Sequence, residues 1–443
     1  PRSTPSNSSA ASDVYKRQGY ECDLWAFENL FDQCNRYICV NRPLRAAQLL
    51  DYVVAHKLFV FNVSESMKDR REAALADRIY QAMDRPCHVM GWYNGRVAEV
   101  EHVARVSLNG CFATCSGGAS NLSVHAGIPA RPTYAPRTLS DAQKQVEKKV
   151  YITFTVSDGD ALWCMNNRFR GHYDEPQRGQ IPMNWEMQML LYHLAPGQLH
   201  YYFNTMTEND YPIASLSGAG YTYPNLHPDP VSYLKYSERY MDLTGLNVIY
   251  AGTQDPYGAW YWGEHEPTEL VELYRRHVPG AIAFIRNYGA WGVPHKQRIE
   301  RGKAPFFCSA LYVNVRREIA DEIQKIVDLE EHRPLFLTVH VRESCPMDKM
   351  VKETRTLRNS GHEVVNFDEF VAKLNAAQEQ GLIGEELYPS REAILGDMAR
   401  RFREQWAGVS RKVSSFLELG DLSDEELDEK FEDFPQWFDT VAH

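Results

Sequence analysis

Two aspartates, separated by one residue, follow the most β-rich apolar run of the sequence. Asp158 and Asp160 come directly after 150–156 (VYITFTV), and Asp210 and Glu264 follow later predicted strands. At the carboxyl ends of parallel barrel strands, the loops converge on one mouth. Two carboxyl groups there can cleave a glycosidic bond, one as proton donor and the other as base or nucleophile. We therefore take these four acids as candidate catalytic residues of a hydrolase acting on glycosidic bonds.

Aromatic, amide and basic side chains recur in the loops after the same runs. Rings stack on the apolar faces of a sugar, while Asn, Asp and Arg side chains hydrogen-bond its hydroxyl groups. The stretch 217–224 (SGAGYTYP) holds two glycines that would let a loop turn tightly beside such a ligand. The candidate substrate-binding residues are Asn209, Gly218, Gly220, Tyr221, Tyr223, Trp260, Trp291, His340 and Arg342.

The main candidates also have structural interpretations. Asp158 and Gly159 form a common turn pair, in which the carboxylate bonds local amides. Together with Asp160, the same turn could instead bind a divalent metal through oxygen ligands. Asp210 could simply cap a turn, and His340 could be a satisfied histidine at a strand end rather than a catalyst.

Several catalytic motifs are missing from the sequence. It has no His-Glu-x-x-His, no Gly-x-Ser-x-Gly, no Walker loop and no pair of histidines four apart. These absences argue against a metalloprotease, a serine esterase and a nucleotide hydrolase. We expect no cofactor and no resident metal, and a metal-dependent deacetylase-like enzyme is kept as an alternative.

The candidate residues need a scaffold that brings distant loops together. From residue 149 onwards, strand-like runs alternate with helical patterns, which indicates parallel βαβ units with both sheet faces covered. About seven such units predict an α/β fold with a (β/α) barrel-like domain, and an open doubly wound sheet is the alternative. The runs are 150–156, 199–204, 247–252, 281–287, 306–313, 335–341 and 362–367.

The sequence also predicts where some elements and domains begin and end. Asp229 can cap a helix that has Pro230 in its first turn and Gly245 at its end. A smaller α/β domain is expected at 19–140, with strand-like runs at 58–63, 87–92 and 111–115 and a helical pattern at 67–83. We expect the barrel-like domain at 148–385, a helical extension at 386–443 and a non-native read-through segment at 1–18.

Charge and cysteine usage restrict the partners and the compartment. The formal net charge of −11 argues against nucleic acid or an anionic membrane surface as a partner, because both require basic patches. Nine cysteines without a Cys-x-x-Cys pair favour reduced thiols and hence the cytoplasm. Export stays open, since the native start is expected to be missing. The expected partner is a carbohydrate, and the oligomeric state is left open.

The stretch 217–224 resembles the signature of the GxGYxYP family of putative glycoside hydrolases. The surroundings agree at 153–160 (TFTVSDGD), 194–225, 91–95 (GWYNG) and 121–127 (NLSVHAG), so the resemblance covers roughly residues 40–385. It implies an N-terminal α/β region, a C-terminal barrel-like domain and a role in carbohydrate metabolism.

Individual residues carry the resemblance. The family's acidic motif is matched by Ser157, Asp158, Gly159 and Asp160, and its second motif by Asn209, Asp210, Gly218, Gly220, Tyr221, Tyr223 and Pro224. One departure is Ala161, where the family commonly has Asn, and this favours the alternative of a non-catalytic carbohydrate-binding protein. We expect Tyr221 and Tyr223 to form part of a sugar-facing wall. In the alternative, one tyrosine packs inward and the loop only braces the acidic turn.

Overall fold

The computed structural model describes residues 8–41, 49–66, 69–93, 99–117, 119–252, 268–286, 297–313, 315, 318–330, 332–384 and 386–387. These residues lie in one compact unit, Pro1–Tyr388. They form a small four-stranded parallel sheet and a larger sheet that curls into a barrel. The expected extension at 386–443 lies outside the described residues, apart from a two-residue strand at its start.

The small sheet has the strand order β2-β1-β3-β4, and all of its neighbours are parallel. Its strands are β1 (Ile38–Asn41), β2 (Phe59–Phe61), β3 (Cys87–Gly91) and β4 (Cys111–Cys115). The predicted runs at 58–63, 87–92 and 111–115 are thus confirmed as strands, and β1 is an additional one. The helices of this part are α1 (Ser8–Leu30), α2 (Leu50–His56), α3 (Arg70–Ala82), α4 (Glu99–Leu108) and α5 (Leu122–Ala126), with the short 3₁₀ helix η1 (Phe31–Gln33). A short helix, α6 (Asp141–Lys144), precedes the first barrel strand.

The larger sheet contains seven parallel strands in the order β12-β5-β6-β7-β8-β9-β11, and β11 pairs with β12 to complete a nearly closed ring. These strands are β5 (Val150–Val156), β6 (Met183–Met187), β7 (Asp210–Ala214), β8 (Val248–Ala251), β9 (Ala283–Arg286), β11 (Phe306–Val313) and β12 (Leu335–Val341). The barrel-like fold is confirmed, and the open doubly wound alternative is wrong. Further short strands are β10 (Gln297–Arg298), β13 (Glu363–Val364) and β14 (Glu386–Leu387).

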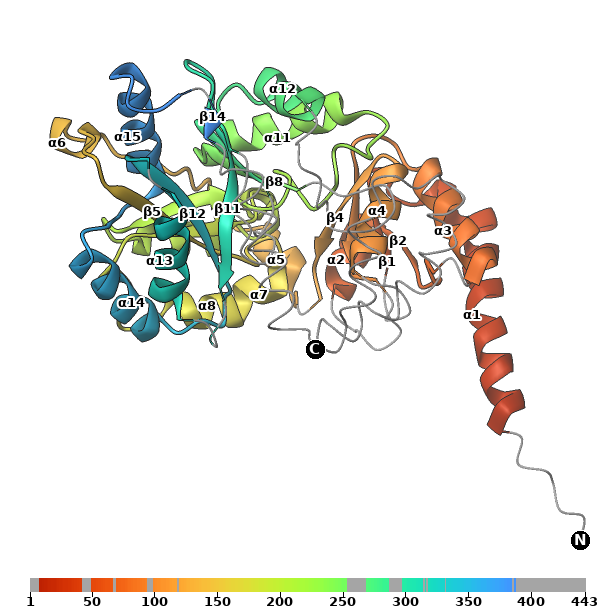
Figure 1. Cartoon of the computed structure of the whole chain (residues 1–443). Helices are drawn as coiled ribbons and strands as arrows, with labels where there is room; N and C mark the ends of the chain where they lie inside the picture. The colour runs from red at the N-terminus through yellow and green to blue at the C-terminus, as the bar shows by residue number, and fades with distance from the viewer. Residues whose placement is uncertain are drawn as a thin grey trace, which may run out of the picture. The chain divides into compact units, whose positions relative to one another are not determined.

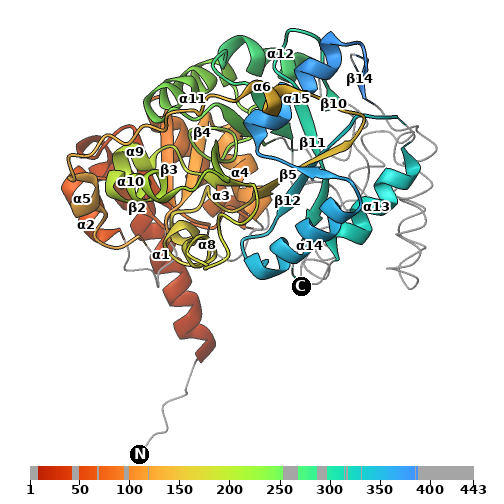
Figure 2. The ribbon, with the colours of Figure 1, turned by 90° about the vertical axis from the view of Figure 1, so that its left-hand side faces the viewer.

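Helices follow the barrel strands, and several of them cover the outer faces of these strands. They are α7 (Leu162–Asn166), α8 (Arg168–Tyr173), α9 (Leu191–Leu194), α10 (Pro196–Thr205), α11 (Pro230–Thr244), α12 (Thr268–His277), α13 (Ile319–Leu329), α14 (Met347–Asn359) and α15 (Phe367–Glu379). Figure 1 shows α13 and α14 outside β11 and β12, and Figure 2 shows α5 beside α9 and α10. The helix predicted between Asp229 and Gly245 is confirmed as α11. The Asp229 side chain accepts a hydrogen bond from the Ser232 amide at 3.1 Å, and Gly245 ends the helix with φ 74°.

Within the seven-stranded ring, one predicted strand is wrong, and two strands were not predicted. The aromatic run 199–204 belongs to α10, because Pro196 starts a helix whose Leu199 and Tyr202 face the core one turn apart. The strand β7 was overlooked because it contains Pro212, and β6 because it carries polar residues in the middle of its sequence, Met-Asn-Trp-Glu-Met. As a consequence, Asp210 begins a strand and does not follow one.

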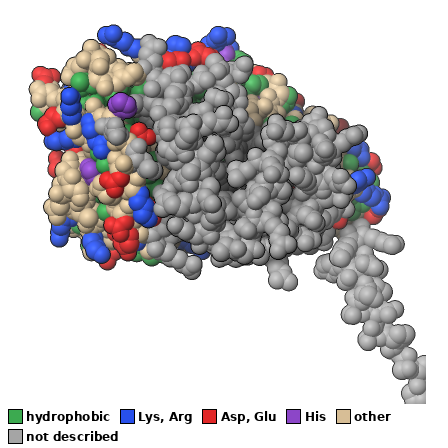
Figure 3. Space-filling model, in the orientation of Figure 1, with side chains coloured by type: hydrophobic (Ala, Val, Ile, Leu, Met, Phe, Trp, Pro, Cys, Tyr) green, Lys and Arg blue, Asp and Glu red, His purple; other side chains and the backbone are tan. Residues whose placement is uncertain are grey.

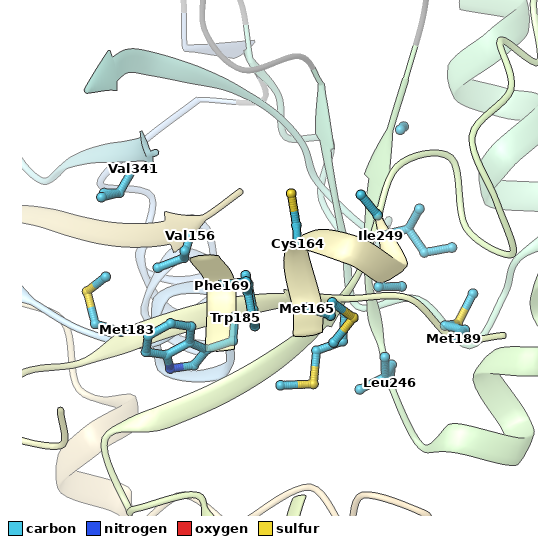
Figure 4. Packing of buried hydrophobic residues seen from close by; sticks show 14 of the residues in the cluster. Val156, Cys164, Met165, Phe169, Met183, Trp185, Met189, Leu246, Ile249 and Val341 are labelled. Carbon is cyan, nitrogen blue, oxygen red and sulfur yellow. The ribbon is translucent and has the colours of Figure 1, made fainter. Parts of the chain in front are cut away.

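The core near the acidic turn lies between the outer face of the barrel and the helices α7 and α8 (Figure 4). Val156 and Val341 are register partners on β5 and β12. The Trp185 ring of β6 meets the Phe169 ring of α8 edge-on, with 5.5 Å between centroids. Deleting a buried aromatic side chain typically costs about 3–5 kcal/mol, so these contacts fix the strand ends that carry the acidic residues.

Figure 3 shows acidic and basic side chains intermixed over the coloured part of one face of the molecule. Within the described part of the chain, no helix has the length and apolar character needed to span a bilayer. The eight cysteines whose side chains are described carry no disulfide.

Candidate active site

The strands β5 and β12 place two acidic residues side by side. Val156 pairs with Val341 at the ends of the strands, and the amide of Ser157 donates to the Val341 carbonyl at 3.0 Å. Two residues beyond each strand end stand Asp158 and Glu343, whose carboxyl groups share a hydrogen bond. Adjacent parallel strands thus deliver a carboxyl pair to the carboxyl end of the barrel.

The turn that carries Asp158 is held against β6 by its backbone. Asp158 has φ 67°, in the left-handed region that costs a non-glycine residue energy. The next residue must be glycine for a different reason: a Cβ on Gly159 would lie 1.6 Å from the Glu186 carbonyl oxygen. A turn held this closely to its neighbour fixes the direction of the Asp158 side chain.

Burial and neighbouring acids favour the protonated form of Asp158. Burial raises its pKa well above the ordinary value, and the hydrogen bond and negative charge of Glu343 raise it further, as do Asp160 and Glu99. Arg168 and Arg342 each place a guanidinium nitrogen 3.5 Å from a Glu343 oxygen. Positive charge therefore accompanies Glu343, and the raised pKa of Asp158 favours its protonated form.

Two further carboxyl groups lie next to this pair. Burial and the charge of Glu99 raise the pKa of Asp160 to about 7. The Glu186 side chain is fully buried, and its pKa rises well above normal through burial and the charges of Asp160 and Asp158, although the amides of Gly159 and Asp158 oppose the rise. Among the described residues, no group of three or more His, Cys, Asp or Glu side chains has the arrangement of a metal site.

The small sheet contributes one acid to this cluster. Glu99, the first residue of α4, is exposed to solvent. The protein atoms around its carboxyl group nevertheless desolvate this group and so raise its pKa. The Tyr221 hydroxyl donates a hydrogen bond to this carboxylate, and nearby His102 also favours its charged form. Glu99 is thus the one acid of the cluster that is supplied from outside the barrel.

The family follows from the sequence of the barrel. Residues 148–375, more than half of the chain, match the profile of the GxGYxYP putative glycoside hydrolase C-terminal domain. The chain belongs to this family. Residues 35–127 match the GxGYxYP third domain, which covers the small sheet.

One solved structure supports the fold of this GxGYxYP protein. It is the crystal structure of a putative hydrolase from Bacteroides thetaiotaomicron, with a TM-score of 0.65 and 22% sequence identity. The alignment covers 80% of this chain and 69% of that one. A comparison with curated proteins gives no match.

The motif after which the family is named joins the barrel to the small sheet. Tyr221 and Ala113 of β4 exchange two backbone hydrogen bonds of 2.8 Å. A Cβ on Gly220 would lie 2.5 Å from the Phe112 ring, and one on Gly218 would lie 2.6 Å from the Ser237 hydroxyl. Close approach, together with φ 110° at Gly218, therefore explains the two glycines.

The expected sugar-facing wall of Tyr221 and Tyr223 is wrong. Both rings are buried, with 2% and 1% of their surface exposed, and their hydroxyl groups lie 3.1 Å apart. The motif glycines are buried as well. A half-buried ring that the prediction passed over is Trp163 of α7, which has the Arg168 guanidinium 5.3 Å from its centroid.

Asp210 and Asn209 do not belong to the acidic cluster, because they lie at the amino end of β7, where Asp210 pairs with Met183 at the start of β6. The Asp210 carboxylate binds Arg178 at 2.5 Å and accepts the Trp185 indole N–H at 2.8 Å. The Asn209 side chain donates to the Gly179 carbonyl at 2.7 Å. These contacts are structural, so the predicted catalytic role of Asp210 and the ligand role of Asn209 are not retained.

The two candidates on β12 differ in their access to solvent. His340 is fully buried between the rings of Tyr250 and Tyr312, and burial lowers its pKa to about 3, so it is neutral. Arg342 has an exposed side chain beside Glu343. A direct ligand contact therefore fits Arg342 and not His340.

Three predicted site residues, Glu264, Trp260 and Trp291, lie outside the described residues. Three acids of the cluster were not selected from the sequence: Glu99, Glu186 and Glu343. Glu343 stands two residues after a predicted strand, as Asp158 does, so the same offset identifies it. Glu186 lies on the overlooked strand β6, and Glu99 reaches the cluster only through tertiary packing.

Proposed function

We propose that this protein hydrolyses glycosidic bonds of a carbohydrate and that Asp158 donates the proton to the leaving oxygen. The observation that carries the proposal is the hydrogen-bonded pair of Asp158 and Glu343 at the carboxyl ends of β5 and β12. A glycosidase needs one carboxyl group that stays protonated near neutral pH and another that is ionised.

Asp158 meets the physical requirements of a proton donor. It is half-buried, so its environment raises its pKa while part of the side chain stays accessible. Its partner Glu343 is only 1% exposed and therefore acts on Asp158 rather than on a substrate. After proton donation, Arg168 and Arg342 offset part of the negative charge that accumulates on the pair.

Other side chains near the pair suit a sugar. Trp163 can offer a flat ring for stacking, and Arg342 can donate to hydroxyl groups. Membership of a family described as putative glycoside hydrolases supports the same substrate class. The structural relative from Bacteroides thetaiotaomicron is a putative hydrolase, which agrees with the reaction class and leaves the sugar open.

The test is a cleavage screen on oligosaccharides and aryl glycosides with the full chain. We expect the wild type to release sugar, and Asp158→Asn to lower kcat about 10²–10⁴-fold on the same substrate. Glu208→Gln is the charge-matched control, because Glu208 is exposed near the amino end of β7. Binding of a glycan without cleavage by the wild type would favour a non-catalytic binding protein, and full activity of Asp158→Asn would remove Asp158 as the acid.

A further inference from the structure

We propose that Glu99 is the second catalytic carboxylate of this site, so that the small sheet and the barrel each supply one of the two acids that act on the substrate. The inference rests on the proposed glycosidase function. It assigns a task to a residue that lies on a helix packed beside the small sheet and far from Asp158 in the sequence.

Access to solvent singles out Glu99 among the neighbours of Asp158. Glu343 is engaged with Asp158 itself and is 1% exposed. Asp160 is 7% exposed and Glu186 is fully buried. Glu99 alone in this described cluster has an exposed side chain, and its charge acts on both Asp158 and Asp160. Of these four carboxyl groups, it is therefore the one that a substrate and a water molecule can reach together.

The family motif holds the Glu99 carboxylate in place. Tyr221 donates to it, which leaves Tyr223 as the donor between the two tyrosine hydroxyl groups at 3.1 Å. The Tyr221 backbone is fixed in turn by its two hydrogen bonds to Ala113 of β4. Desolvation raises the pKa of Glu99, and the hydrogen bond from the Tyr221 hydroxyl opposes this rise and so favours the ionised form that a general base requires. Tyr221 is therefore a positioning residue, and its ring need not touch the sugar.

A second network fixes the helix from which Glu99 projects. One turn further along α4, His102 Nδ1 lies 2.5 Å from Glu65 Oε2, and both side chains are 1% exposed. The hydroxyl of Tyr80 donates to the other Glu65 oxygen at 2.6 Å. Tyr80 thus orients the Glu65 carboxylate, and this carboxylate holds His102 in the first turn of α4.

The reaction step balances with these two acids and one water molecule. Asp158 gives its proton to the glycosidic oxygen, and the bond from that oxygen to the anomeric carbon breaks. Water forms a new bond to the anomeric carbon and gives a proton to Glu99. The sum is addition of water across the glycosidic bond, after which the two carboxyl groups exchange their proton with solvent.

The titratable groups around Glu99 come from several elements. Two acids, Asp158 and Asp160, follow β5, and two tyrosines, Tyr221 and Tyr223, belong to the motif loop. His102 lies on α4 itself. The remaining groups are Tyr93 after β3 and Cys115 at the end of β4. Burial keeps the pKa values of the tyrosines and of Cys115 above normal, so these groups stay uncharged near neutral pH.

The test uses azide, an anionic nucleophile that needs no base. On an aryl glycoside that the wild type cleaves, we expect Glu99→Gln and Glu99→Ala to lower kcat at least ~100-fold. Sodium azide should then restore turnover of Glu99→Ala at least ~10-fold and give the glycosyl azide, because the small side chain leaves room for the anion. Glu101→Ala on the same helix is the matched control, with unchanged turnover and no response to azide.

Tyr221→Phe tests the positioning role, because it keeps the ring and removes the donor. The Glu99 pKa should rise, so the acidic limb of the pH profile of kcat/KM should move to higher pH while the thermal midpoint changes little. If Glu99→Gln keeps full activity while Asp158→Asn is inactive, the inference is wrong and the proposed function stands. If the wild type cleaves no glycoside, both the inference about Glu99 and the proposed function are wrong.

Discussion

The carboxyl groups of Asp158 and Glu343 share a hydrogen bond at the ends of two strands that are neighbours in the barrel and far apart in the sequence. Such a pair holds one proton more firmly than either carboxyl group would alone. The register of β5 and β12, fixed by apolar residues, therefore sets the acidity of Asp158.

We expect Glu343→Gln to lower the pKa of Asp158, because it removes the negative charge that favours the protonated form. An acid that loses its proton more easily is inactive from a lower pH upwards. The alkaline limb of the pH profile of kcat/KM should therefore move down by about one unit or more. Glu208→Gln should leave the profile unchanged, and an alkaline limb that stays in place in Glu343→Gln would mean that another group donates the proton.

Asp160→Asn should stabilise the fold at alkaline pH. The Asp160 pKa is about 7 in the folded chain, against 3.8 for an ordinary aspartate. Because the folded value is raised, the wild type loses stability as pH rises from about 4 to about 7, on the order of 4 kcal/mol in total. Asparagine has no charge to desolvate, so urea unfolding should show a gain for the variant at pH 8 that shrinks at pH 4. Equal differences at both pH values would argue against a buried, protonated Asp160.

Gly159→Ala should disrupt the acidic turn. Its Cβ would lie 1.6 Å from a backbone oxygen, which cannot move as a flexible side chain could. We expect a loss of at least about 3 kcal/mol in the free energy of unfolding. Gly171→Ala is the control, because nothing lies within 4 Å of its Cβ in the helix α8, and alanine there should stabilise by about 0.5–1 kcal/mol.

Asp210→Asn should cost stability and spare catalysis. The variant loses the charge that pairs with Arg178 in a site where the Asp210 side chain is fully buried. Leaving a buried partner without its counter-charge costs about 3 kcal/mol, which a thermal or urea melt measures. Turnover per folded molecule should equal that of the wild type, whereas a stable but inactive variant would return Asp210 to the catalytic residues.

The sequence predicted the barrel because its strands β5, β11 and β12 are continuous apolar runs, which a strand buried on both faces requires. It failed at β6, whose polar residues pair inside the protein: the Asn184 side chain donates to Thr153 at 2.7 Å and to the Phe154 carbonyl at 2.6 Å. Hydropathy patterns cannot reveal polar groups that are satisfied by a strand 30 residues away.

The limited information in local sequence patterns also explains which site residues were predicted correctly and which were not. The position of Asp158 followed from its place after a strand, but Asp210 was assigned to the wrong end because an aromatic helix resembled a strand. Tyr221 and Tyr223 suggested a sugar wall, yet tyrosine is equally suited to burial when its hydroxyl finds a partner. Whether these tyrosines are buried or face a ligand depends on the contact of their loop with β4. No local pattern of the sequence encodes that contact.

The most direct test of the central claim, that Asp158 protonates the leaving group, varies the leaving group itself. Asp158→Asn and the wild type are compared on phenyl and 2,4-dinitrophenyl glycosides of one sugar that the wild type cleaves. The dinitrophenolate departs without a proton, so we expect the loss in kcat/KM to be at least ~100-fold larger on the phenyl glycoside. Equal losses on both substrates, or no loss on the phenyl glycoside, would contradict the account.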